Sequence, residues 1–179
     1  MLPNFETQRL LVRPRTMADF EDCLAMDRDI EVTKHIPGPW HDPEQHEAFV
    51  RQRMQADYGP GLGYGTVVDK LHSGRFLGWI LLIPADGTGP EIEIGWRLVR
   101  EAWGRGYATE AAIPVVRHAF VTLKADRIVA EIAPRNAASL RVAQKLGLTD
   151  AGMHHDQGAI WRRFQITRSD FASLEAAGR

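Results

Sequence analysis

The sequence predicts a mixed α+β fold in which a mostly antiparallel, strongly twisted sheet of about seven strands is flanked by about four helices. Three short apolar runs, 64–69, 75–83 and 91–99, are separated by clusters of Gly and Pro, which is typical of an antiparallel meander. A helical segment over 107–123 and a strand over 127–132 follow. The chain therefore carries a meander first and an alternation of helix and strand after it.

The composition is that of an ordinary globular protein. Of the 179 residues, 44% are hydrophobic and 25% are charged, and no repeat, low-complexity tract or linker interrupts the sequence. We therefore expect a single domain over 1–179, with a core over about 7–168 and a C-terminal tail over 169–179 that forms a short helix.

The charge balance argues against a nucleic-acid or membrane partner. Lys and Arg total 22 against 23 Asp and Glu, so no overall field favours a polyanion. Cys23 is the only cysteine, and we expect it to be a core thiol in a reducing compartment. No apolar segment approaches the about 20 residues that span a bilayer, and the N-terminus does not resemble a secretory signal. We expect a cytoplasmic monomer or homodimer.

The N-terminal third predicts one strand and two helices. The strand covers 7–13 and ends at Pro14. Thr16 opens the first helix through a capping box. A loop rich in proline, 35–43, leads into a second helix that runs to about residue 57, with Pro43 in its first turn.

The C-terminal third predicts one more helix and two more strands. The helix covers 136–145 and is stopped by Gly147 in the position of a left-handed C-cap. The strands cover 148–155 and 159–167. Within the preceding helix, Pro114 removes a backbone donor, so we expect a kink there.

A glycine-rich turn at the start of the 107–123 helix suggests a phosphate site. Gly104 and Gly106 allow close approach of the backbone to a ligand, and a helix N-terminus favours negative charge. No Gly-Lys-Ser/Thr ending or third glycine follows, so neither a nucleoside triphosphatase loop nor a dinucleotide fingerprint is favoured. A plain strand-to-helix turn remains the alternative from the glycines alone.

The wording of this turn, Trp-Gly-Arg-Gly-Tyr-Ala-Thr-Glu-Ala over 103–111, resembles the GNAT superfamily of N-acetyltransferases, and within it the ribosomal-protein (Rim-like) branch. Gly106 and Ala108 stand in the small-residue positions, whereas Trp103 replaces the Gln or Arg of the general pattern. Three other segments resemble the same branch in the same order, and they are 7–14, 93–98 and 136–147.

The resemblance implies a sheet splayed between its fourth and fifth strands, with acetyl-coenzyme A bound in the gap as co-substrate and no metal. The turn amides would hold the pyrophosphate, and the pantetheine arm would pair with 98–100 like an added strand. The residues implied to bind the coenzyme are Trp96, Leu98, Val99, Arg100, Trp103, Gly104, Arg105, Gly106, Tyr107, Ala108, Asn136, Ser139 and Lys145.

The resemblance also implies direct attack of an amine on the thioester, without an acyl-enzyme. Glu93 and Glu131 are the candidate bases, with proton removal by neither as the alternative. Ser139 is the candidate group beside the sulfur, or else an N-terminal helix cap. The tyrosine that many GNAT enzymes use as acid is absent, because its position is Ala143.

The acceptor is expected between the 35–43 loop and the final hairpin, which carries His154 and Trp161. A protein N-terminus or a small-molecule amine fits this reading best. His154 and His155 are neighbours on a strand, so they face opposite ways and do not make a metal site. A coenzyme A-binding protein without catalysis, or a transferase of another acyl group such as succinyl, are the competing interpretations.

Overall fold

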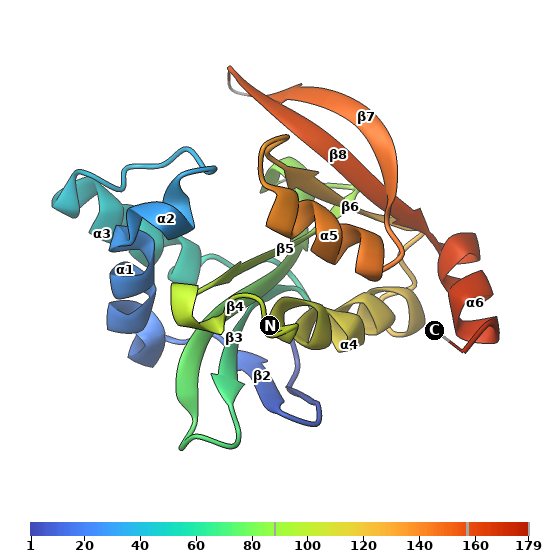
Figure 1. Ribbon diagram of the computed structural model, residues 1–179, viewed down its shortest axis with the longest axis horizontal. Coiled ribbons are helices and arrows are strands. Elements are labelled where there is room, and N and C mark those ends of the chain that lie inside the picture. The colour runs from blue at the N-terminus through green and yellow to red at the C-terminus, as the bar shows by residue number, and fades with distance from the viewer. Residues whose placement is uncertain (88, 157, 179) are drawn as a thin grey trace.

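The computed structural model describes residues 1–87, 89–156 and 158–178, and their backbone forms one twisted sheet with helices on both faces (Figure 1). Over these residues the sheet has eight strands in the order β1-β2-β3-β4-β5-β6-β8-β7. The strands are β1 (Phe5–Glu6), β2 (Leu10–Pro14), β3 (Gly63–Asp69), β4 (Arg75–Pro84), β5 (Ile92–Leu98), β6 (Arg127–Ile132), β7 (Thr149–Asp156) and β8 (Ala159–Thr167).

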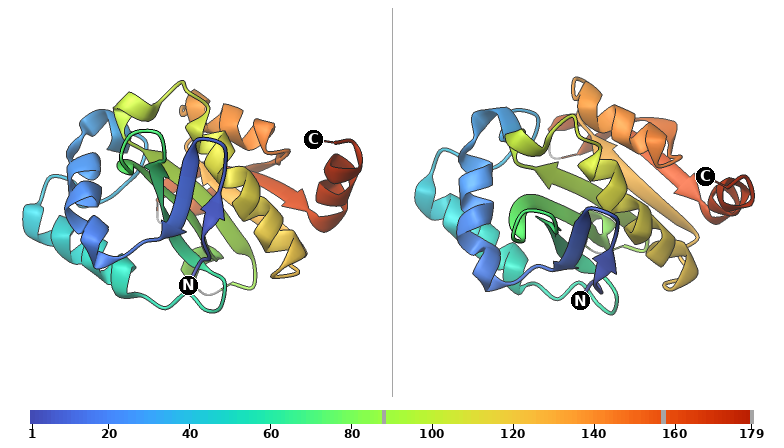
Figure 2. Two further views of the ribbon diagram at one scale, coloured as in Figure 1. Left: turned by 90° about the horizontal axis from the view of Figure 1, so that it is seen from below. Right: turned by 60° about the horizontal axis from the view of Figure 1, so that its bottom comes forward.

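Helices cover the sheet from two sides (Figure 2). The α-helices of the described residues are α1 (Phe20–Arg28), α2 (Ile30–Thr33), α3 (Pro43–Gln55), α4 (Tyr107–Val121), α5 (Ala137–Lys145) and α6 (Arg168–Ala176). One buried cluster joins α4 and α5 to one face of the sheet, and a second joins α1 and α3 to the other. In the part of the chain that the structure describes, every helix is too short or too polar to cross a bilayer.

The predicted mixed fold is confirmed, with one strand and one helix more than the sequence indicated. The strand expected over 7–13 is wrong at its start, because β1 and β2 form a hairpin whose turn contains Thr7. The Thr7 amide donates to Leu10 O at 2.9 Å, which closes that turn before β2 begins. The helix that the sequence did not indicate is the four-residue α2, whereas α6 is the short helix expected in the C-terminal tail.

Local helix signals operate where the sequence placed them. Thr16 makes the expected capping box, although it first caps a short 3-10 turn (Met17–Asp19) from which α1 continues. Gly147 follows α5 with a φ of 84°, the left-handed geometry of a C-cap. The chain remains helical through Pro114, so α4 is not divided there.

Strand β4 contains a bulge beside β5. The register with β3 shifts between Val67 and Val68, and Gly78 takes a φ of 137° at this point. A Cβ at Gly78 would lie 2.1 Å from Arg97 O, so only glycine allows β4 and β5 to approach so closely. The bulge thereby sets the position of the C-terminal end of β5.

Strands β5 and β6 are the parallel pair in this sheet, and they separate almost at once. Their pairing consists of Ile92 with Ile128 and Glu93 with Val129. All the other neighbouring strands pair in antiparallel fashion over longer stretches, apart from the two-residue β1. From Ile94 onward β5 diverges from β6, as the splayed fold predicted.

Candidate active site

The glycine-rich turn opens α4 without a side-chain cap. Gly106 is the N-cap residue in the left-handed conformation, with a φ of 78°. The next amides, those of Tyr107, Ala108 and Thr109, have no intrahelical acceptor, and no side chain of the described residues caps them. A helix start with free donors and a positive dipole end is suited to an anion.

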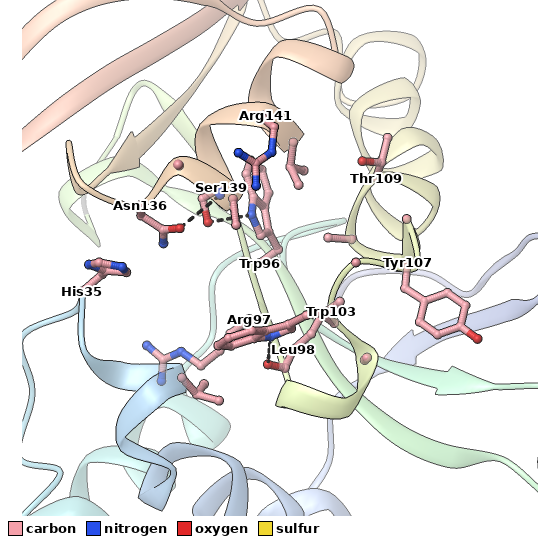
Figure 3. Close-up of a pocket in the computed structure, with 18 of the residues that line it drawn as sticks. His35, Trp96, Arg97, Leu98, Trp103, Tyr107, Thr109, Asn136, Ser139 and Arg141 are labelled. Atoms are coloured by element: carbon pink, nitrogen blue, oxygen red, sulfur yellow. Dashed lines mark hydrogen bonds between the residues drawn. The ribbon is translucent and has the colours of Figure 1, made fainter.

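A pocket of about 420 Å³ lies in front of this helix start and extends along β5 and α5 to the residues after α2 (Figure 3). Thr109 and Tyr107 lie at one side of it, Trp96 and Ser139 in the middle, and His35 at the opposite side. The predicted coenzyme-binding residues that line it are Trp96, Leu98, Trp103, Gly104, Gly106, Tyr107, Ala108, Asn136, Ser139 and Lys145.

Three predicted coenzyme-binding residues do not line the pocket. The Val99 amide donates to Leu77 O at 3.0 Å, and Arg100 begins a 3-10 turn (Arg100–Ala102) with its guanidinium paired to Asp29. The Arg105 carbonyl accepts a hydrogen bond from Arg9 at 3.0 Å. These contacts hold the loop in shape, so the three residues contribute to the scaffold of the pocket.

The indole of Trp96 connects β5 to the start of α5. Its Nε1 donates to Ser139 Oγ at 3.3 Å, and the Ser139 amide donates to Asn136 Oδ1 at 3.1 Å (Figure 3). Asn136 is therefore the residue that caps α5, and Ser139 lies in the first turn with its hydroxyl in the pocket. The alternative that Ser139 is itself the cap is wrong.

A second indole, that of Trp103, fixes the glycine-rich turn against the end of β5. Trp103 Nε1 donates to Leu98 O at 2.8 Å, which folds the turn back onto the end of β5 (Figure 3). The Leu98 carbonyl is thus already occupied. The departure from the usual Gln or Arg at Trp103 has a structural explanation in this bond.

Comparison with known proteins identifies the family of this chain. The sequence model of the acetyltransferase (GNAT) domain matches residues 9–149. The chain belongs to the GNAT acetyltransferase family. Protein YkkB of Bacillus subtilis (strain 168) is 33% identical over 141 residues, which are 76% of this chain and 81% of that protein.

Two further comparisons agree with the family. The FsC-acetyl coenzyme A-N(2)-transacetylase of Aspergillus fumigatus is 32% identical, over 97% of this chain and 80% of its own length. The crystal structure of a GNAT-family acetyltransferase from Bacillus anthracis superposes with a TM-score of 0.76 at 26% identity, covering 93% of this chain and 99% of that one. This GNAT protein is accordingly an acyltransferase enzyme.

The two carboxylates that the sequence analysis selected as candidate bases lie outside the pocket of this acetyltransferase. Glu131 accepts from Arg163 Nε at 2.6 Å and contacts His154 Nδ1 at 3.0 Å, both through Oε1. Its Oε2 is buried without a partner among the described residues. Glu93 is half-buried on β5 and is not among the residues that line the pocket.

The acetyltransferase also has a buried charge pair beside the pocket that the sequence analysis missed. Arg97 donates to Asp27 at 2.6 Å, and both side chains are at least nine-tenths buried. The guanidinium lies 4.9 Å from the ring centroids of both Trp40 and Trp79. The alternation along β5 could have indicated this, because Arg97 faces the same side of the strand as Gly95, opposite to Trp96.

Cys23 and His154, two other titratable residues that the sequence analysis considered, lie outside the pocket. Cys23 is buried, and burial raises the pKa of its thiol to about 12, which agrees with the expected core thiol. His154 contacts Glu131 and does not line the pocket. No group of three or more His, Cys, Asp or Glu residues with metal-binding geometry occurs within the described ranges.

Proposed function

We propose that this enzyme transfers the acetyl group of acetyl-coenzyme A to a primary amine by direct attack. The observation that carries the proposal is the uncapped start of α4 at Gly106, which opens into a pocket that continues along β5, whose edge toward β6 has no strand partner beyond Glu93. A pyrophosphate fits free amides, and a linear pantetheine arm fits a strand edge without a partner. The relative named as an acetyl coenzyme A-N(2)-transacetylase supports this choice of donor and of nitrogen as acceptor.

Within this proposal, the chain holds the donor at three places. The amides of Tyr107, Ala108 and Thr109 would face the pyrophosphate, and Arg141 and Lys145 of α5 add positive charge to the pocket lining. The bound thioester supplies an activated acetyl group. Asn136 and the Trp96 edge of β5 lie where the pantetheine arm would pass (Figure 3).

Ser139 is proposed to act at the sulfur. Because Trp96 Nε1 already donates to its Oγ, the Ser139 hydroxyl hydrogen is left for donation to another acceptor. A departing thiolate is such an acceptor, so Ser139 can stabilise it in place of the tyrosine that Ala143 replaces. Glu93 and Glu131 would reach an amine only through intervening water, because neither lines the pocket.

The choice of acetyl over succinyl rests on Arg97. This cation lines the pocket but already has Asp27 as its counter-ion at 2.6 Å. Asp27 therefore already neutralises the charge of Arg97, so Arg97 would attract a carboxylate on the acyl chain only weakly. The residue pattern of the glycine-rich turn extends the proposal to the ribosomal-protein branch, with a protein N-terminus among the acceptors. The single buried cysteine leads us to propose the cytoplasm as its location.

Calorimetry and a turnover assay test the proposal together. We expect acetyl-coenzyme A to bind, to compete successfully with succinyl-coenzyme A, and to be consumed when one of several amines is added. The panel contains spermidine, free amino acids, an aminoglycoside and a short peptide with a free N-terminus. No heat of association with acetyl-coenzyme A on folded protein would exclude the proposal, and binding without turnover on any amine would leave a non-catalytic coenzyme-binding protein.

A further inference from the structure

We propose that His35 is the catalytic residue that takes the proton from the acceptor amine, an inference that rests on the proposed function. His35 lies in the loop after α2, and it lines the same pocket as Trp96 and Ser139. In Figure 3 its ring lies on the α2 side, on the same side of the pocket as Asn136, with Ser139 in the middle. The donor-binding side, at Thr109, is opposite.

The position of His35 places it where an acceptor must enter. The start of α4 and the first turn of α5 line the part of the pocket assigned to the pyrophosphate and pantetheine. The rest of the lining comes from the end of β5 with the turn after it and from α2 with the loop that follows, and His35 is the imidazole among these residues. An imidazole there lines the same pocket as Ser139, where the sulfur is proposed to lie.

The other charged groups that line this pocket are poorly suited to accept a proton. Glu31 is paired with Lys34 at 2.6 Å, and the hydrogen bond from Lys34 holds the pKa of Glu31 below its ordinary value. Arg97 is bonded to Asp27, and guanidinium groups keep their proton in proteins. The charged groups that line the pocket as a whole, from α2, β5 and α5, are Glu31, Lys34, Arg97, Arg141 and Lys145.

The His35 ring is not committed to another contact. Among the described residues it makes no hydrogen bond, ion pair or ring contact, and it is half-buried. Glu131, by contrast, is held by Arg163 and His154 outside the pocket. Imidazole is also the side chain that ordinarily exchanges a proton between about pH 5 and 8. An unbonded imidazole inside the pocket is therefore better suited than either glutamate to the direct step.

The loop that carries His35 is fixed against β5. Trp40 Nε1 donates to Ile36 O at 2.8 Å, and the Trp40 ring lies over the Arg97 guanidinium. Gly38 packs on the same indole so closely that a Cβ would lie 2.2 Å from a ring carbon. This packing holds His35 beside the strand that would carry the thioester.

The proposed step balances as follows. An acceptor ammonium gives one proton to the neutral imidazole of His35 and becomes an amine with a free electron pair. The amine nitrogen then forms a bond to the thioester carbonyl carbon, and the carbon–sulfur bond breaks with its electron pair on sulfur. The second nitrogen proton passes to the thiolate, giving an amide and a free thiol. His35 finally releases its proton to solvent.

Kinetics of matched variants test the assignment. We expect His35→Gln to lower kcat/KM at pH 7 by about 100-fold or more, with the deficit shrinking above about pH 9 as the amine loses its proton unaided. His41→Gln is the control, because His41 is exposed in the same loop and does not line the pocket. Added imidazole should restore activity to His35→Ala and leave the rate of His41→Gln unchanged. Equal rates for the two glutamine variants would overturn the proposal.

Proton NMR of the histidine C2–H signals gives a readout without any acceptor. Spectra of His35→Gln and His41→Gln assign the two signals, and acetyl-coenzyme A at a saturating concentration fixed by calorimetry should shift the His35 signal alone. Binding heat with an unmoved His35 signal would overturn this inference and leave the proposed function standing. Absence of binding heat would remove the proposed function and this inference together.

Discussion

The guanidinium of Arg9 and the carboxylate of Glu110 join two parts of the chain that are about a hundred residues apart. Arg9 Nε donates to Glu110 Oε2 at 2.7 Å, and Thr7 Oγ1 donates to Oε1 at 2.6 Å. The same guanidinium donates to Arg105 O and lies 4.4 Å from the ring centroid of Tyr107. The β1–β2 turn is therefore what holds the glycine-rich turn in place.

Glu110→Gln should loosen this attachment. The loss of charge-assisted hydrogen bonds is expected to cost about 2 kcal/mol of unfolding free energy and to weaken acetyl-coenzyme A binding about tenfold. Urea denaturation and calorimetry measure the two effects. Glu175→Gln is the matched control, because it removes an exposed partner of Arg117 elsewhere on α4 and should cost less than about 1 kcal/mol. Indistinguishable binding by the two variants would contradict the anchoring role.

Glu110 also predicts an acid limit to stability. Burial would raise the pKa of Glu110, but hydrogen bonds from Thr7 and Arg9 outweigh it and hold that pKa below its ordinary value. Because the folded pKa is depressed, this contribution is full above the unfolded value of about 4.3 and is lost as pH falls through the folded pKa. Melting curves from pH 6 to 3 should show Glu110→Gln losing less stability toward low pH than the parent enzyme. Parallel curves would argue against this linkage.

Two substitutions at Gly106 separate backbone strain from ligand repulsion. Its φ of 78° disfavours any other residue, but a Cβ would meet nothing closer than Arg9 at 3.7 Å. Gly106→Ala should therefore fold at a cost of about 1–2 kcal/mol and still bind acetyl-coenzyme A. Gly106→Glu adds negative charge where a pyrophosphate is proposed, and calorimetry should detect no binding. Tight binding by the glutamate variant would exclude this turn as the phosphate site.

Ser139 and Asn136 can be told apart by their separate roles. Asn136→Ala removes the cap of α5 and should cost about 1 kcal/mol of stability. Ser139→Ala keeps that cap, so its stability should change by less than about 0.5 kcal/mol, whereas turnover should fall at least about tenfold. Thermal melts and steady-state kinetics on both variants give the comparison. An unchanged turnover rate in Ser139→Ala would show that the hydroxyl does not act in catalysis and only accepts the hydrogen bond from Trp96.

The Asp27–Arg97 pair should be important for stability. Asp27→Asn leaves a buried guanidinium without its counter-ion and is expected to cost about 3–5 kcal/mol, measured by urea denaturation. The double variant Asp27→Asn with Arg97→Met should recover a large part of this loss. Glu6→Gln is the control, since Glu6 pairs with Lys70 at the surface. A loss of less than about 1 kcal/mol in Asp27→Asn would show that water already screens the pair.

Much of the fold could be predicted from the sequence because its local signals are strong. Strands β8 and β6 have the predicted bounds. Helix α5 begins directly after its polar cap, Asn136, and ends shortly before Gly147. The glycine-rich turn likewise showed itself through residues that have few other uses. These features depend on neighbours in sequence, which is the information that a single chain carries most directly.

The rest depended on contacts between distant segments. Arg9 and Glu110 read as ordinary surface charges until the fold brings them together, and the Thr7 turn read as strand for the same reason. The sequence identified His35 only as the first residue of a loop. Tertiary packing, here that of Trp40 on Arg97, decides which residue of this loop faces the pocket. Of the candidate bases, Glu131 was chosen from the family resemblance, which does not reveal that Arg163 holds it.

The brief seam between β5 and β6 has a mechanical consequence. With only two residue pairs across it, the backbone groups that face the gap must find partners in solvent or in a guest. A molecule bound between β5 and β6 would behave as a removable ninth strand and would connect the two halves of the sheet. Binding of this molecule would then also stiffen the sheet. The amides near Gly95 and Ala130 would exchange more slowly in the ligand-bound enzyme than in the free enzyme.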